Sequence, residues 1–189
     1  MSTASPDVDD GAAALERLRY PVGRFDARIR VTHEQRGALI DQIAGAPEQL
    51  RRAVRGLSDE QLATPYRPDG WTVRQVVHHV PDSHLNAYIR FKLALTEDTP
   101  RINTYDEKLW AGLPDTANTP IDVSLALLDA LHVRWVALLR AMSDADFART
   151  MNHPDWPRPL DLSTTLRLYA WHGGHHTAHI TTLRERMGW

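Results

Sequence analysis

The sequence predicts an all-α protein, a four-helix bundle with short additional helices. Four long stretches carry apolar residues at the spacing of an amphipathic helix, and alternating strand patterns are nearly absent. The chain has 189 residues, of which 42% are hydrophobic, so it can bury the core of one domain. Connections between the four stretches are not all short, which still fits a bundle.

The first long helix is expected from Thr32 to Leu57. We expect Gly45 and Pro47 to break it into two pieces, because proline removes a backbone donor. The second is expected from Thr72 to about Leu95, and its first residues, TVRQ, fit a capping box.

The third long helix is expected from Pro120 to about Met142, with Thr119 as its cap. The fourth runs from Ser163 to Met187 and is expected to end at Gly188. Short helices are expected at Asp59–Ala63, Tyr105–Ala111 and Ser143–Arg149.

Composition excludes several classes of protein. The 22 Lys and Arg residues against 24 Asp and Glu residues give a net charge of -2, which argues against nucleic-acid binding. No apolar run is long enough to span a membrane. The chain has no cysteine, which excludes disulfides, thiolate ligands and a cysteine nucleophile.

The N-terminal segment MSTASPDVDDGAA is polar and acidic and does not resemble a secretory signal. We expect residues 1–14 to be a flexible tail, residues 15–189 to be a single domain, and the protein to be cytoplasmic.

Histidine is unusually clustered. Of the 10 histidines, seven lie in the windows 78–84 and 172–179. His172 and His176 are one helical turn apart, about 6 Å along the axis, and can converge on one divalent cation. His175 and His179 form a second such pair on another face. Gly173 and Gly174 lower helix propensity, which suggests that space around this helix matters.

A third ligand could come from the second helix, where His78, His79 and His84 lie. His84 is nearest the apolar stripe, His79 flanks it, and His78 points most nearly to solvent, so geometry alone does not choose between His79 and His84. Neutral imidazoles suit Zn, Ni, Fe or Cu, and three protein ligands leave positions for water or substrate. The competing interpretation is that these histidines are surface or hydrogen-bonded core residues.

Five segments resemble the YfiT-like branch of the DinB superfamily. They are YPVGRF (20–25), GWTVRQVVHHVPDSHLNAYIRFKLALTEDTP (70–100), YDEKLW (105–110), LHVRW (131–135) and YAWHGGHHTAHI (169–180). The resemblance covers nearly all of the chain after residue 19.

The resemblance implies a four-helix bundle that binds a divalent metal, usually zinc or nickel, through three histidines. The first ligand of the family stands eight residues after a Trp, which selects His79 after Trp71, and the other two match His172 and His176. Pro81 departs from the family, where a small residue is usual, and could bend the helix after His79. Homodimers are common in the superfamily.

The activity implied is that of a metal-dependent hydrolase or of a thiol S-transferase that uses a low-molecular-weight thiol such as bacillithiol. A hydrolase needs a general base, and the available carboxylates could reach the site only through the fold; they are Asp82, Glu97, Asp106 and Glu107. A thiol transferase needs no such base and no protein cysteine, which favours it on mechanism. The alternative is a non-catalytic metal-binding or stress-response module.

Four further residues could bind a small-molecule substrate. Asn86 and Arg90 share the flank of His79, although ion pairing or a polar seam would also explain them, and Tyr88 and Trp171 could line a pocket or pack in the core. We expect the remaining histidines, His33, His132 and His153, to lie on the surface.

Overall fold

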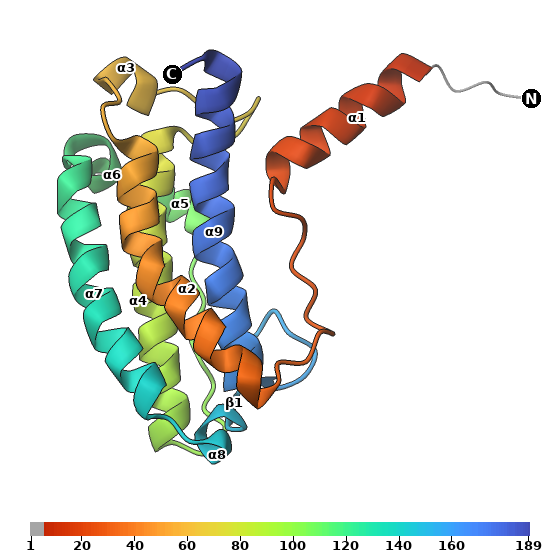
Figure 1. Ribbon diagram of the computed structural model, residues 1–189, viewed down its shortest axis with the longest axis vertical. Helices are drawn as coiled ribbons and strands as arrows, with labels where there is room; N and C mark the ends of the chain where they lie inside the picture. Colours follow the sequence, from red (N-terminus) through yellow and green to blue (C-terminus); the bar gives the residue numbers. More distant parts are fainter. Residues whose placement is uncertain (1–5) are drawn as a thin grey trace, which may run out of the picture.

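The computed structural model describes the backbone of residues 6–189 and side chains from residue 11 onward. Four long helices form a bundle (Figure 1): α2 (His33–Val54), α4 (Val73–Thr96), α7 (Ile121–Ala141) and α9 (Leu162–Met187). Helix α2 packs against α7 and α9, and α4 packs against the same two helices. Helices α2 and α4 are consecutive long helices of the chain, yet they lie at opposite corners. The predicted all-α bundle is confirmed.

Short elements connect the long helices. They are α3 (Asp59–Leu62), α5 (Glu107–Ala111), α6 (Pro114–Asn118) and α8 (Asp144–Phe147), with an antiparallel pair, β1 (Thr150–Met151) and β2 (Leu160–Asp161). The sequence predicted α3, α5 and α8 but not α6 or the strand pair. The strands have two residues each, too few for an alternating pattern.

Part of the N-terminal segment is helical. Residues 6–14, expected within a flexible tail, belong to α1 (Pro6–Arg19), which stands apart from the bundle in Figure 1. The run AAALERLR at its end consists of good helix formers, which explains helical structure without a packed core. The first five residues of the predicted tail lie outside the described residues.

Helix ends largely follow the predicted caps. At α4, the Gln75 backbone N–H donates to Thr72 Oγ1 (3.2 Å), and the Thr72 N–H donates to Gln75 Oε1 (2.9 Å). Helix α9 ends at Gly188, which has φ 70°. Thr119 was wrongly predicted to cap α7, because Pro120 holds that position, with φ -58° and ψ 140°. The Thr119 N–H instead closes α6 on the carbonyl of Asp115.

The predicted break in the first long helix is also wrong. Helix α2 continues through Gly45 and Pro47. Proline lacks the N–H that would reach the carbonyl four residues earlier. That carbonyl, of Ile43, instead accepts a hydrogen bond from His132 Nδ1 at 2.7 Å. His132 on α7 thus replaces the hydrogen bond that Pro47 cannot make. Helix α4 likewise continues through Pro81.

The core consists of two apolar clusters separated by a layer of histidines. One cluster includes Ile43, Phe91, Trp135, Leu139 and Leu166, and the other includes Leu50, Val76, Leu128, Ile180 and Leu183. In α4 and α9, the histidines from His79 to His84 and from His172 to His179 lie along the chain where one cluster gives way to the other. The polar layer is therefore held between two apolar blocks.

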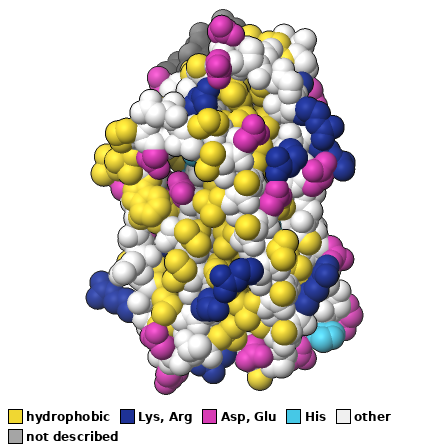
Figure 2. Space-filling model, turned by 90° about the vertical axis from the view of Figure 1, so that its left-hand side faces the viewer, with side chains coloured by type: hydrophobic (Ala, Val, Ile, Leu, Met, Phe, Trp, Pro, Cys, Tyr) yellow, Lys and Arg dark blue, Asp and Glu magenta, His cyan; other side chains and the backbone are white. Residues whose placement is uncertain are grey.

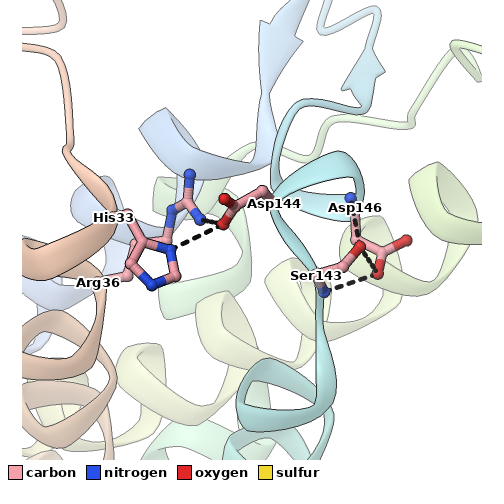
Figure 3. A network of polar contacts seen from close by, with 5 residues as sticks. All are labelled: His33, Arg36, Ser143, Asp144 and Asp146. Atoms are coloured by element: carbon pink, nitrogen blue, oxygen red, sulfur yellow. Dashed lines mark hydrogen bonds and ion pairs between the residues drawn. The ribbon is translucent and has the colours of Figure 1, made fainter.

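A polar network joins the start of α2 to α8 (Figure 3). His33 Nδ1 lies 2.9 Å from Asp144 Oδ1, and Arg36 pairs with the same carboxylate. Ser143 and Asp146 form a capping box at the start of α8. His33 is exposed, as predicted, and acts in this surface network.

Charged and apolar side chains are mixed on the face shown in Figure 2. Helix α7 exposes several apolar residues, including Val123, Leu127 and Val133. Among the described helices, none combines the length and the apolar character that a membrane crossing requires.

Candidate metal centre

Helices α4 and α9 bring His79, His172 and His176 together. One ring nitrogen from each lies within 4.8 Å of the others. His79 Nε2 and His172 Nε2 lie 3.3 Å apart. His79 and His176 are buried and His172 is half-buried. The three residues that the resemblance selected are therefore neighbours in the fold.

The spacing of these nitrogens fits a shared cation. Two imidazole nitrogens bound at about 2.0–2.1 Å in tetrahedral geometry lie roughly 3.3 Å apart. Burial lowers the pKa of His79 to about 4, and burial lowers the pKa of His172 and His176 well below the ordinary value. The neighbouring imidazoles lower these pKa values further. The rings are thus neutral at pH 7, the state that binds metal.

A second group, His175, His176 and His179, also has ring nitrogens within 4.8 Å of one another. Its outer members have other partners. His179 Nε2 donates to the carbonyl of Arg19 (3.1 Å), and its ring stacks on Tyr66. His175 stacks on Trp171, with ring centroids 4.3 Å apart. All three come from one helix, whereas the first group draws its ligands from two.

The histidines of α9 open onto a cavity of about 510 Å³. His172 and His176 line it, while Trp71 packs against both His79 and His176, with centroids 4.6 and 6.2 Å apart. Besides the histidines, the lining has aromatic and charged members: Tyr20, Tyr66, Trp71 and Trp171; Arg19, Arg67 and Lys108; Asp69 and Glu107. The cavity therefore combines aromatic walls with both signs of charge.

Of the four residues proposed to bind substrate, Trp171 lines this cavity. The other three lie elsewhere among the described residues. Tyr88 packs in the core, and the Asn86 amide donates to the Asp82 carbonyl on its own helix. Arg90 donates to Tyr169 Oη (3.3 Å) and to the Asn103 carbonyl (3.1 Å). These positions support a core role for Tyr88 and roles in polar contacts within the bundle for Asn86 and Arg90.

Of the four carboxylates considered as a base, Glu107 lines the cavity. Burial of its carboxyl raises its pKa, although the residue as a whole is exposed. Asp106 caps α5 by accepting the N–H groups of Lys108 and Leu109, and Glu97 is exposed at the end of α4. Burial raises the pKa of Asp82 to about 6, but Asp82 is not among the lining residues.

Sequence reasoning misplaced two histidines. His78 and His132, expected towards solvent, are buried. His78 Nδ1 contacts Ser124 Oγ (2.7 Å). The sequence reasoning also missed Tyr66 and Arg67, which line the cavity. Both precede α4 in a loop in which the Tyr66 N–H donates to the Trp71 carbonyl (3.0 Å). The turn residues Pro65, Pro68 and Gly70 marked that loop without indicating a site.

Fold and site together define a helical bundle with a three-histidine centre beside an open cavity. Residues 42–180 match the family model of the DinB superfamily. Proteins from Bacillus mycoides (strain KBAB4) and Bacillus cereus (strain B4264) are each 53% identical to this chain over 175 residues, which cover 93% of it and 100% of each relative. Both carry the name "putative metal-dependent hydrolase".

A solved structure, YfiT from Bacillus subtilis, superposes with a TM-score of 0.89 at 51% identity, covering 92% of this chain and 99% of that chain. It is described as "a probable metal-dependent hydrolase with an unusual four-helix bundle topology". The chain belongs to the DinB superfamily.

Proposed function

We propose that this protein is a metal-dependent hydrolase in which His79, His172 and His176 hold one divalent ion. The observation that carries the proposal is the 3.3 Å separation of two neutral Nε2 atoms from different helices, with a third imidazole nitrogen within 4.8 Å. The names of the relatives support the same activity. Zinc and nickel both suit imidazole ligands, and the ligand set does not distinguish them.

Three protein ligands leave coordination positions open, which distinguishes a catalytic site from a closed structural one. When bound, the ion supplies Lewis acidity, which acidifies water and polarises a carbonyl group. The protein supplies the rest. Glu107 can accept a proton, because a raised pKa brings a carboxylate nearer to neutral pH. The aromatic walls offer apolar contact to a small substrate, and Arg19, Arg67 and Lys108 attract an anionic group on it.

Thiol transfer is the second candidate. The observation that favours it is the set of three cationic side chains in the cavity lining of a chain without cysteine, which suits an external thiol that carries carboxylates. The presence of Glu107 in the same cavity supplies the base that the sequence alone did not identify, and this favours hydrolysis.

The metal content of purified variants tests the site. The wild-type protein should bind about one Zn²⁺ per chain, as one three-histidine site requires. His79→Ala should abolish binding, whereas the matched variant His175→Ala should retain it. The reverse pattern would move the site to the second histidine group, and no metal in any form after reconstitution would overturn the proposal.

The two chemistries are separated by a direct comparison. Zn²⁺-loaded protein is incubated with p-nitrophenyl acetate alone, and separately with a small thiol and a monohalogenated electrophile. Hydrolysis that His79→Ala abolishes supports the proposal. Accelerated formation of the thioether with no ester hydrolysis would assign the protein to thiol transfer.

We also propose a homodimer, as is common in the superfamily. The apolar residues that α7 exposes are consistent with an interface between copies. Light scattering should then give twice the chain mass of 21.4 kDa. A mass of one chain at micromolar concentration would contradict it.

A further inference from the structure

Two buried histidines lie beside the metal centre without belonging to it. His84 of α4 and His132 of α7 have exposed fractions of 0% and 2%. Neither is in the group that His79, His172 and His176 form. Buried polar groups need hydrogen-bond partners, and both residues have them in an unbroken series.

The series starts at a backbone carbonyl. His132 Nδ1 lies 2.7 Å from the oxygen of Ile43, which can only accept a hydrogen bond. His132 Nδ1 must therefore carry the proton. Burial lowers the pKa of His132 to about 4, so the ring has a single proton at pH 7 and His132 Nε2 is an acceptor.

The same reasoning assigns the protons of His84 and His172. His84 Nδ1 lies 2.8 Å from His132 Nε2, so His84 Nδ1 donates and His84 Nε2 accepts. The two rings are nearly parallel, with an interplanar angle of 13° and centroids 5.0 Å apart. His84 Nε2 lies 3.1 Å from His172 Nδ1, which therefore donates. His172 Nε2 is left with a lone pair, facing His79 Nε2 at 3.3 Å and Ser83 Oγ at 3.4 Å.

Two features of the sequence make room for this series. Pro47 has no N–H, which leaves the carbonyl of Ile43 free for His132. A Cβ atom at Gly173 would lie 3.1 Å from Ala46 Cβ and 3.6 Å from His84 Cε1. The 3.1 Å contact with Ala46 would be tight, so glycine there lets α9 approach α2 closely beside the His84 ring. Residues on all four long helices thus contribute to the arrangement.

We infer that His84 and His132 are positioning residues, which pass a fixed orientation of protons from the Ile43 carbonyl to His172 and keep its Nε2 lone pair directed at the metal centre. The inference rests on the proposed function, because it assigns a role towards the proposed ligand. A hydrogen bond to the far nitrogen of a ligating histidine fixes both its tautomer and its ring orientation. Here that partner is itself held by a second histidine.

The first test is made on the metal-free protein and needs no activity. Long-range ¹H–¹⁵N spectra of ¹⁵N-histidine-labelled protein identify the protonated nitrogen of each ring. The expected result is a proton on Nδ1 of His132, His84 and His172. A dominant Nε2–H tautomer at His172 or His84 would overturn the inference, whether or not the protein binds metal.

The second test uses His132→Phe, which removes the acceptor of His84. Loss of such a partner typically weakens metal affinity 10- to 100-fold, and we expect a loss of that size for Zn²⁺ in competition with a chromophoric chelator. The His172 tautomer should shift towards Nε2–H. His132→Gln, whose amide oxygen can accept the His84 proton, should restore most of the affinity; it also serves if the Phe variant does not fold.

The matched control is His78→Phe. His78 is another buried histidine of α4 that contacts α7, through Ser124, but lies outside the series. The His78→Phe variant should keep the wild-type Zn²⁺ affinity, although its free energy of unfolding should fall. Equal loss of affinity in both Phe variants, or no loss in His132→Phe, would overturn the inference. Failure of the wild-type protein to bind Zn²⁺ or Ni²⁺ would instead overturn the proposed function, and the tautomer spectra would still decide the role of the series.

Discussion

At the scale of single residues, Glu107 is the side chain whose role depends most on the fold. In the sequence it is one of four carboxylates that could reach the histidines only through the fold. In the structure α5 brings it to the wall of the cavity that His172 and His176 line. A base assignment therefore becomes testable only with the structure.

We predict that Glu107→Gln lowers the turnover of an activated ester by about 10²–10⁴-fold, because the amide cannot accept a proton. Metal content should stay at the wild-type value, since Glu107 is not in the histidine group. Rates are measured with p-nitrophenyl acetate at saturating Zn²⁺. The control Glu97→Gln changes a carboxylate outside the cavity and should have no effect. Equal rates for both variants would remove Glu107 from the mechanism.

The histidines show what the sequence could and could not predict. The spacing of His172 and His176 predicted a convergent pair, and the resemblance selected His79. Helical periodicity could not place His132, because α7 packs against both α2 and α4 and so buries a wider arc than one stripe. Which nitrogen faces which partner follows from packing between helices, which one sequence does not contain.

At the scale of elements, the four long helices were predictable because each has a strong apolar period. The effect of a proline inside one of them was not predictable. Pro47 predicted a break, but tertiary structure supplies a donor from α7 to the carbonyl that the proline leaves free. The adjacent glycines of α9 indicated that space around this helix matters, and the structure shows a close approach at Gly173 but none among the described atoms at Gly174.

These two glycines make a matched test of helix packing. At Gly173 a Cβ atom would lie 3.1 Å from Ala46 Cβ, and at Gly174 it would meet no described atom within 4 Å. We predict that Gly173→Ala destabilises the protein by about 1–3 kcal/mol, as overpacking does. Gly174→Ala should stabilise it by about 0.5–1 kcal/mol through helix propensity. Urea unfolding measures both, and effects of the same sign would contradict this account of α9.

At the scale of the whole molecule, a layer of neutral histidines between two apolar clusters couples stability to pH. Burial lowers the pKa of His132 and His79 to about 4 in the folded protein. In the unfolded chain a histidine titrates near 6.5. Between these values the unfolded state binds more protons, so the free energy of unfolding falls as pH falls from about 6.5 to about 4.

We predict that the metal-free protein loses stability throughout this window, with a slope of up to about 1.4 kcal/mol per pH unit for each such histidine. Asp82 and Glu107 act in the opposite direction, since burial raises the pKa of Asp82 to about 6 and also raises that of Glu107, but these carboxyls are outnumbered by the buried histidines. Urea unfolding at pH 7.5, 5.5 and 4.5 with a chelator present gives the slope. A free energy of unfolding that stays constant or rises towards pH 4.5 would show that the buried histidines do not make stability depend on pH in this way.

The central claim is that imidazoles from α4 and α9 share one ion with open coordination positions. Anomalous diffraction from crystals grown with Zn²⁺ tests it most directly. We predict one peak at about 2.0–2.1 Å from a ring nitrogen of each of His79, His172 and His176, with solvent in the remaining positions. A peak among His175, His176 and His179, or a fourth protein ligand closing the site, would contradict the claim.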